Sequence, residues 1–178
     1  MIVYKDIISN DEMITSAYKQ DLVYDKEGLV IPGMFQVESS MKTKGSESID
    51  IGCGNSFGGG EEEIADNSVE KVNDIIDSFS YTEVPFGNKQ EFKEYITSYM
   101  RSIRTKLKEK GTPQVEIKEF MTQAPGMVKF LLGKFSDMQT FAGESLSAEG
   151  GMGFGFYKDG AHCPSFVYIT KALVAEKF

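Results

Sequence analysis

The feature that most constrains this fold is a strongly helical block in the middle of the chain, flanked on both sides by strand-like sequence. Asn88 begins the block and Glu91 follows three positions later, a spacing typical of an N-terminal capping box. Gly111 and Pro113 predict the C-terminal end of a first helix. Between these signals, apolar residues recur every three or four positions on one helical face: Phe92, Ile96, Tyr99, Ile103 and Leu107.

A second helix is expected to start near Pro113 and to run towards Phe135. Pro125-Gly126 lies inside it, and a proline in a helix interior removes a backbone donor, so a kink or an interruption is predicted there. Two helices joined by so short a link form an antiparallel hairpin. The block over residues 88–135 is therefore predicted to be a helical hairpin.

Strand-like sequence lies on both sides of this hairpin. Residues 1–40 and 138–178 hold short apolar runs rich in β-branched and aromatic residues, with turn signals such as Pro32-Gly33 between them. Residues 69–84 fit both a helical and a strand period, so periodicity leaves that segment open. Strands, helices and strands in this order predict an α+β fold with a mostly antiparallel sheet and segregated helices. Because the hairpin is then an insertion, both ends of the chain are expected to contribute to the sheet.

Residues 45–68 differ from the rest of the chain because they combine six glycines with six acidic residues and contain no Lys or Arg. Such a segment cannot bury enough apolar surface to offset the entropy of ordering it, which predicts a long mobile acidic loop. Its carboxylates could attract calcium, with Glu61, Glu62 and Glu63 as weak candidates. No EF-hand spacing is present, so the expected dissociation constant is at best about 10⁻⁴–10⁻³ M. A solvated loop without a specific ion is the alternative interpretation, and no cofactor is expected to be required.

Charge and composition exclude several classes of function. The chain has 178 residues and a net charge of −8, which argues against nucleic acid as a partner because phosphate binding needs a basic surface. Two cysteines and one histidine are too few for a disulfide scaffold or a four-ligand Cys/His zinc site. No apolar run approaches the roughly 20 residues of a membrane span, and no signal peptide is visible. The expectation is a soluble cytoplasmic protein without a membrane partner, with unconventional secretion left open.

Few residues point to catalysis. His162 and Cys163 resemble a base and a nucleophile, but neighbours in sequence rarely face one reacting atom, so an exposed turn histidine is preferred over a hydrolase. A stronger signal is the one basic cluster of this acidic chain, at the C-terminal end of the first helix. Its members are Arg101, Arg104, Lys106, Lys108 and Lys110. This cluster could dock an acidic surface such as a tubulin tail. The alternative is a solvated helix end whose cations favour the helix dipole.

Several short motifs, colinear along the whole chain, resemble the translationally controlled tumour protein family. The sequence from Met1 to Ser9, with Asp11 and Glu12 after it, resembles the family's start. Motifs that resemble its helices, its second signature and its close follow in order: Tyr95-Ile96, Tyr99-Met100, Lys106-Leu107, Phe120-Met121-Thr122, Phe141-Ala142-Gly143-Glu144 and Phe166-Val167-Tyr168-Ile169. The chain departs from the family's first signature at Cys53-Gly54. It also ends in Phe178 where some members end in Cys, so their terminal disulfide dimer is not carried over.

The resemblance implies a single domain over residues 1–178, with a β-tent core of two small sheets, a projecting helical hairpin and a mobile acidic loop. It also implies that residues 69–84 are strand. Family members are described as non-enzymatic, multi-partner cytoplasmic proteins that bind calcium, tubulin and microtubules, and that act on small GTPases or elongation factor 1-alpha. By this resemblance Glu12 and Glu144 match the acids of a GTPase-facing groove, and the basic cluster lies in the segment linked to tubulin. The alternative function is that of a guanine-nucleotide-exchange accessory factor for a small GTPase.

Overall fold

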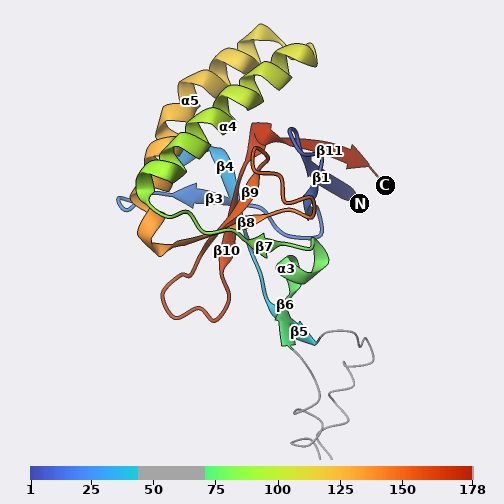
Figure 1. Ribbon diagram of the computed structural model, residues 1–178, viewed down its shortest axis with the longest axis vertical. Helices are drawn as coiled ribbons and strands as arrows, with labels where there is room; N and C mark the ends of the chain where they lie inside the picture. Colours follow the sequence, from blue (N-terminus) through green and yellow to red (C-terminus); the bar gives the residue numbers. More distant parts are fainter. Residues whose placement is uncertain (44–70, 178) are drawn as a thin grey trace, which may run out of the picture.

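The computed structural model describes residues 1–43 and 71–177, and its strands form antiparallel pairs in three sheets (Figure 1). The largest sheet has the order β3 (Asp21–Tyr24), β4 (Val30–Glu38), β10 (Ser165–Ile169), β9 (Met152–Phe156), β8 (Met138–Ala142) and β7 (Thr82–Glu83). The second has the order β11 (Leu173–Lys177), β1 (Ile2–Asp6) and β2 (Glu12–Thr15), and the third pairs β5 (Met41–Thr43) with β6 (Lys71–Asn73). The helices are α3 (Asp74–Ser78), α4 (Lys89–Glu109) and α5 (Gln114–Gly133), with short 3-10 turns η2 (Phe135–Asp137) and η3 (Thr170–Ala172). This arrangement confirms the predicted α+β fold with antiparallel sheets and a helical pair.

The two ends of the chain meet in the three-stranded sheet. β1 lies between β2 and β11, and Val3 pairs with both Thr15 and Glu176. The expectation that both ends contribute to the sheets is therefore confirmed. Figure 1 shows the two termini close together on one side, α4 and α5 side by side at one end, and β5 and β6 at the other.

The core has two parts, one on each face of the six-stranded sheet. Strand β10 alternates between them, because Phe166 and Tyr168 face one cluster while Val167 and Ile169 face the cluster under the helices. A glycine in β9 makes room for one of these two clusters. A Cβ on Gly153 would lie 2.9 Å from a ring carbon of Tyr81, so the missing side chain makes room for the aromatic cluster. The central strands are thus buried on both faces and fix where the helices pack.

The ends of α4 follow the sequence signals. Asn88 Oδ1 accepts the backbone N–H of Glu91 at 2.9 Å, and the Glu91 carboxylate reaches back to the N–H of Gly87 at 2.9 Å. At the other end Gly111 adopts a φ of 77°, and the N–H of Thr112 donates to the carbonyl of Leu107.

No helix of the described residues is both long and apolar enough to cross a membrane.

The segment 69–84 corrects one expectation. The resemblance implied a strand, but the structure has β6, the short helix α3 and β7 within it. The helix forms because Asn73 Oδ1 accepts the N–H groups of Ile75 and Ile76, at 3.0 and 3.1 Å, and caps the first turn. The turn also buries Ile75 completely. A local cap and one buried side chain therefore outweigh the strand period here.

Of the kink or interruption expected at Pro125, the interruption is wrong, because α5 continues through this position from Gln114 to Gly133. Pro125 leaves the carbonyl of Met121 without its usual donor, a loss that ordinarily weakens a helix. The apolar face of α5 packs on the sheet and holds the helix together across this position. Its buried members are Ile117, Phe120, Ala124, Met127 and Leu131.

Pro32-Gly33 forms no turn, because it lies inside β4. The pairing with β3 shifts here, since Leu22 is opposite Phe35 while Tyr24 is opposite Val30. The extra residues form a bulge, which suits a proline that lacks an N–H and a glycine with a φ of 91°. A Cβ on Gly33 would lie 2.8 Å from Gln123 Oε1, so the glycine lets β4 approach α5 closely.

Candidate functional site

The basic cluster lies in the C-terminal half of α4 and at Lys110 directly after it, and the structure divides it between two sides of the helix. Arg101 and Arg104 line a groove between α4 and α5. Lys106 and Lys110 instead line a depression beside β1 and β11. Lys108 is exposed and lines neither hollow. One run of sequence therefore contributes cations to two different surfaces.

The two sides also differ in their electrostatics. Lys106 lies 3.9 Å from Glu109, and the depression beside it holds the ion pair of Lys5 with Glu176 at 2.7 Å. The hydrogen bond to Glu176 raises the pKa of Lys5. Arg101, Arg104 and Lys108 have no ion pair with any residue in the described ranges. On the side of α4 that faces α5 and solvent, these three cations therefore lie without an acidic partner among the described residues, whereas on the other side acidic side chains lie beside Lys106 and Lys110.

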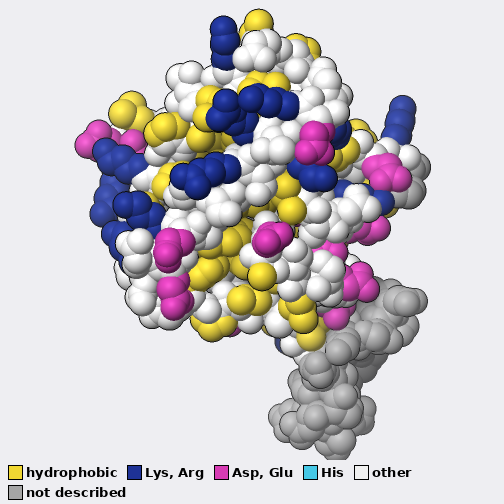
Figure 2. All heavy atoms as spheres, turned by 45° about the horizontal axis from the view of Figure 1, so that its top comes forward, with side chains coloured by type: hydrophobic (Ala, Val, Ile, Leu, Met, Phe, Trp, Pro, Cys, Tyr) yellow, Lys and Arg dark blue, Asp and Glu magenta, His cyan; other side chains and the backbone are white. Residues whose placement is uncertain are grey.

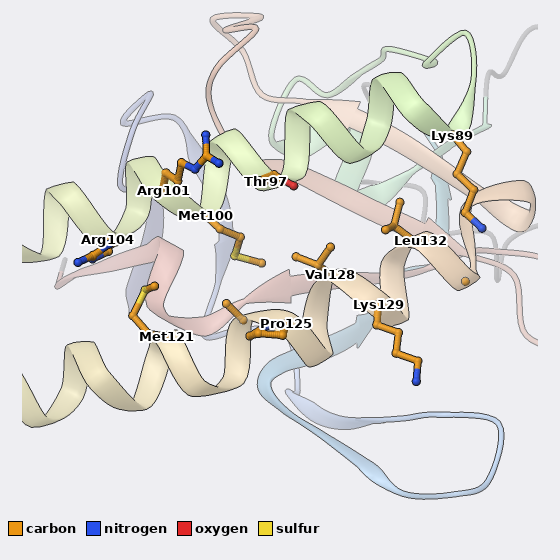
Figure 3. A pocket seen from close by; sticks show the side chains of 12 residues that line it. Lys89, Thr97, Met100, Arg101, Arg104, Met121, Pro125, Val128, Lys129 and Leu132 are labelled. Carbon is orange, nitrogen blue, oxygen red and sulfur yellow. The ribbon is translucent and has the colours of Figure 1, made fainter.

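The groove between α4 and α5 has a volume of about 730 Å³ and an apolar floor (Figure 3). Met100 of α4 and Val128 of α5 point into the space between the helices. The groove was not predicted from the sequence, although α5 carries a signal for it. Apart from its buried face, α5 has a second stripe of apolar residues at helical spacing: Met121, Pro125, Val128 and Leu132. Its first stripe packs on the sheet, and the second remains partly open to solvent.

Glu12 and Glu144 lie on two segments that the structure ties together. Asp11 accepts the hydroxyl of Ser145 at 2.7 Å and its backbone N–H at 3.3 Å. Gly143 permits this contact, because a Cβ there would lie 2.7 Å from Asp11 Oδ2. Both glutamates are exposed. The predicted pair therefore lies on neighbouring segments of one surface, and Asp11, whose role the sequence did not reveal, joins them.

A buried carboxyl group connects this surface to α4. Asp6 is 1% exposed and accepts the Tyr99 hydroxyl at 2.5 Å. Tyr95 donates to the carbonyl of Gly150 at 2.6 Å. Burial, and after it the negative charge of Asp6, raises the pKa of Tyr99 well above its usual value. These contacts hold the end of β1, the loop before β9 and α4 in one fixed arrangement.

The remaining candidates gain little support. Glu61, Glu62 and Glu63 lie outside the described residues, so the weak calcium site stays a prediction. Within residues 1–43 and 71–177, no group of three or more His, Cys, Asp or Glu side chains could hold a metal ion. His162 is exposed and Cys163 is half-buried, which agrees with a turn position.

Comparisons with known proteins agree with this fold. The sequence matches the family profile described as translationally controlled tumour protein over residues 1–174. A curated relative, the translationally-controlled tumor protein homolog of Theileria annulata, is 34% identical over 178 residues and covers 100% of both chains. The structure of p23fyp, the translationally controlled tumor-associated protein of Schizosaccharomyces pombe, has a TM-score of 0.74, 30% identity and complete coverage of both chains. The NMR structure of the Caenorhabditis elegans protein has a TM-score of 0.63 at 22% identity, covering 100% of this chain and 99% of that one, and supports the fold. The chain therefore belongs to the translationally controlled tumour protein family.

Proposed function

We propose that this chain is a non-enzymatic, cytoplasmic, multi-partner binding protein whose α4 cations bind tubulin and microtubules. The observation that supports this most is the exposed side of α4, where Arg101, Arg104 and Lys108 have no acidic partner within the described residues. In a chain of net charge −8, a local positive surface of this kind favours an acidic partner such as the tail of tubulin. Weak calcium binding through Glu61, Glu62 and Glu63 remains part of this proposal.

Reversing the free charges of α4 should weaken microtubule binding. We expect the Arg101→Glu, Arg104→Glu, Lys108→Glu variant to bind at least about fivefold more weakly than the parent, because attraction to an acidic surface becomes repulsion. Co-sedimentation with microtubules measures this. Binding of the parent should also weaken steeply as salt is raised.

A matched control carries the same change in charge on exposed lysines elsewhere: Lys19→Glu, Lys26→Glu and Lys177→Glu. This control should sediment with microtubules nearly as well as the parent. Equal sedimentation of the α4 variant and the parent would contradict the proposal. Equal loss in both variants would contradict it too, because net charge and not the α4 surface would then govern binding.

A second candidate is a guanine-nucleotide-exchange accessory role towards a small GTPase, or binding to elongation factor 1-alpha. The supporting observation is the link between Asp11 and Ser145, which holds the segments of Glu12 and Glu144 together on one exposed surface. An exchange factor needs no acid–base group, since it acts by binding the nucleotide-free state more tightly than the loaded one.

Release of a fluorescent nucleotide from a small GTPase tests this second role. The parent should accelerate release, and Glu12→Val with Glu144→Val should slow it about tenfold, since both acids face the proposed partner. The control Glu27→Val, an exposed acid on another loop, should behave as the parent. If the parent accelerates nucleotide release at no concentration, the exchange role is contradicted and only binding to partner proteins is left.

A further inference from the structure

The groove between α4 and α5 combines an apolar floor with a wholly positive rim. The charged residues among its lining are Lys89, Arg101, Arg104 and Lys129, and no Asp or Glu of residues 1–43 and 71–177 lines it. All four are exposed, and none has an ion pair with another described residue. Figure 2 shows Lys and Arg side chains gathered over the helical end of the molecule, with hydrophobic side chains exposed between them.

The floor is more apolar than a solvated helix pair requires. Met121 is 40% exposed although it lies beside the cations of the rim. Val128 and Leu132 follow it on α5, and Figure 3 shows them directed into the space between the two helices. From Met121 to Leu132 the stripe extends over about 16 Å, at 1.5 Å per helical residue. That length matches about three turns of a further helix.

We propose that this groove binds an amphipathic, acidic helix of a partner protein. Two adjacent helices present a furrow into which a third helix can lay its apolar side chains, spaced at three and four residues. Acidic side chains on the flanks of that helix would meet the four cations of the rim. The proposal is independent of tubulin binding, because it requires the apolar floor, which a hydrophilic acidic tail would leave hydrated.

Other occupants suit the groove less well. A membrane surface needs apolar side chains that protrude, whereas Met100 and Val128 are recessed between the helices. A second copy of this chain would bring a net charge of −8 for each subunit to the interface, which disfavours self-association. An acidic helix satisfies both the apolar and the charged features of the groove.

The probe is a fluorescein-labelled peptide of about 14 residues, with leucines at helical spacing and glutamates on both flanks. Its anisotropy, titrated with the full chain at low salt, should show saturable binding. Met121→Glu should weaken this binding at least about tenfold, because it places a carboxylate among the apolar contacts. Val115→Glu is the matched control: it lies on the same helix, is 76% exposed and is not part of the groove, so binding should not change.

A second pair of variants tests the rim. The double variant Arg101→Glu, Lys129→Glu should also weaken binding of the peptide about tenfold. The control Lys108→Glu, Lys118→Glu makes the same change in net charge at two exposed positions outside the groove, and it should alter binding less than about twofold. Circular dichroism confirms that each variant is folded. Because Met121→Glu retains every cation of α4, it should still sediment with microtubules, so failure of this proposal is distinguishable from failure of tubulin binding.

Four outcomes would overturn the proposal. The first is no saturable binding of the probe by the parent chain. The second is equal binding of a control peptide in which serines replace the leucines, because charge alone would then explain the interaction. The third is a dimer of the parent in solution that Met121→Glu dissociates, which makes a second copy the occupant. The fourth is binding to anionic phosphatidylserine vesicles, lost in Met121→Glu, in place of binding to the peptide.

Discussion

Replacing Asp6 with alanine is expected to lower the free energy of unfolding by about 3–5 kcal/mol. The Asp6 carboxyl group is 1% exposed and accepts four hydrogen bonds. Three come from the backbone of Ile8 and from the backbone and hydroxyl of Ser9, and the fourth comes from the buried hydroxyl of Tyr99 at 2.5 Å. Alanine leaves these donors without an acceptor, and water cannot easily replace it for Tyr99. Urea unfolding followed by circular dichroism measures the loss.

A double-variant cycle separates this network from a general effect of substitution. In the Tyr99→Phe background the buried hydroxyl is already absent, so Asp6→Ala should cost at least about 1 kcal/mol less than in the parent. The exposed acid Asp159 is a suitable control, because Asp159→Ala should change stability by less than about 0.5 kcal/mol. A loss below about 1 kcal/mol for Asp6→Ala, or strict additivity with Tyr99→Phe, would contradict the role assigned to this network.

Features that depend on neighbouring residues were predictable from the sequence. The cap at Asn88, the turn at Gly111 and the apolar face of α4 are local, since each pairs residues within about one or two helical turns. The antiparallel α+β arrangement followed from the order of strand-like and helical segments. The family resemblance supplied what these patterns could not, namely that the strands divide between sheets. It implied two small sheets, whereas the described residues form three, the largest with six strands.

Features that depend on distant residues were missed. Asn73 caps α3, but the helix is also held by burial of Ile75 in a core built from other strands. Pro125 is tolerated because α5 packs on the sheet, a contact that helix propensity does not register. Likewise, the basic residues of α4 form one cluster in the sequence, but on the helix Arg101 and Lys106 lie on different surfaces. The groove with α5 requires both helices in register, so no single segment revealed it.

Raising the pH above about 10 is expected to unfold the chain, because buried tyrosines resist ionisation. Burial raises the pKa of Tyr81, Tyr99 and Tyr168 above the usual value near 10, and the pKa of Tyr18 rises to about 12. In the unfolded chain these phenols lose their protons near pH 10. The stabilisation by their protonated forms is therefore complete below pH 10 and is lost as the pH rises towards the folded pKa values. Between the pKa of the unfolded chain and that of the folded chain, each such phenol lowers the free energy of unfolding by up to about 1.4 kcal/mol for every unit by which the pH rises.

The buried phenols of Tyr81, Tyr99 and Tyr168 together contribute a slope of about 4 kcal/mol per pH unit, against a typical domain stability of about 5–15 kcal/mol. Tyr95, whose pKa is also raised by burial, adds to this slope. Tyrosinate absorbance and circular dichroism should consequently change together in one cooperative transition, within about two or three pH units above 10. Tyr168→Phe removes one of these phenols while Tyr81 keeps its hydrogen bond to the carbonyl of Met13, so the slope should become shallower by about 1.4 kcal/mol per pH unit. Tyr157→Phe, at a position 54% exposed, should leave the slope unchanged. Gradual ionisation of all tyrosines near pH 10 with intact circular dichroism would show that the aromatic cluster admits water and that its phenols are not held protonated by burial.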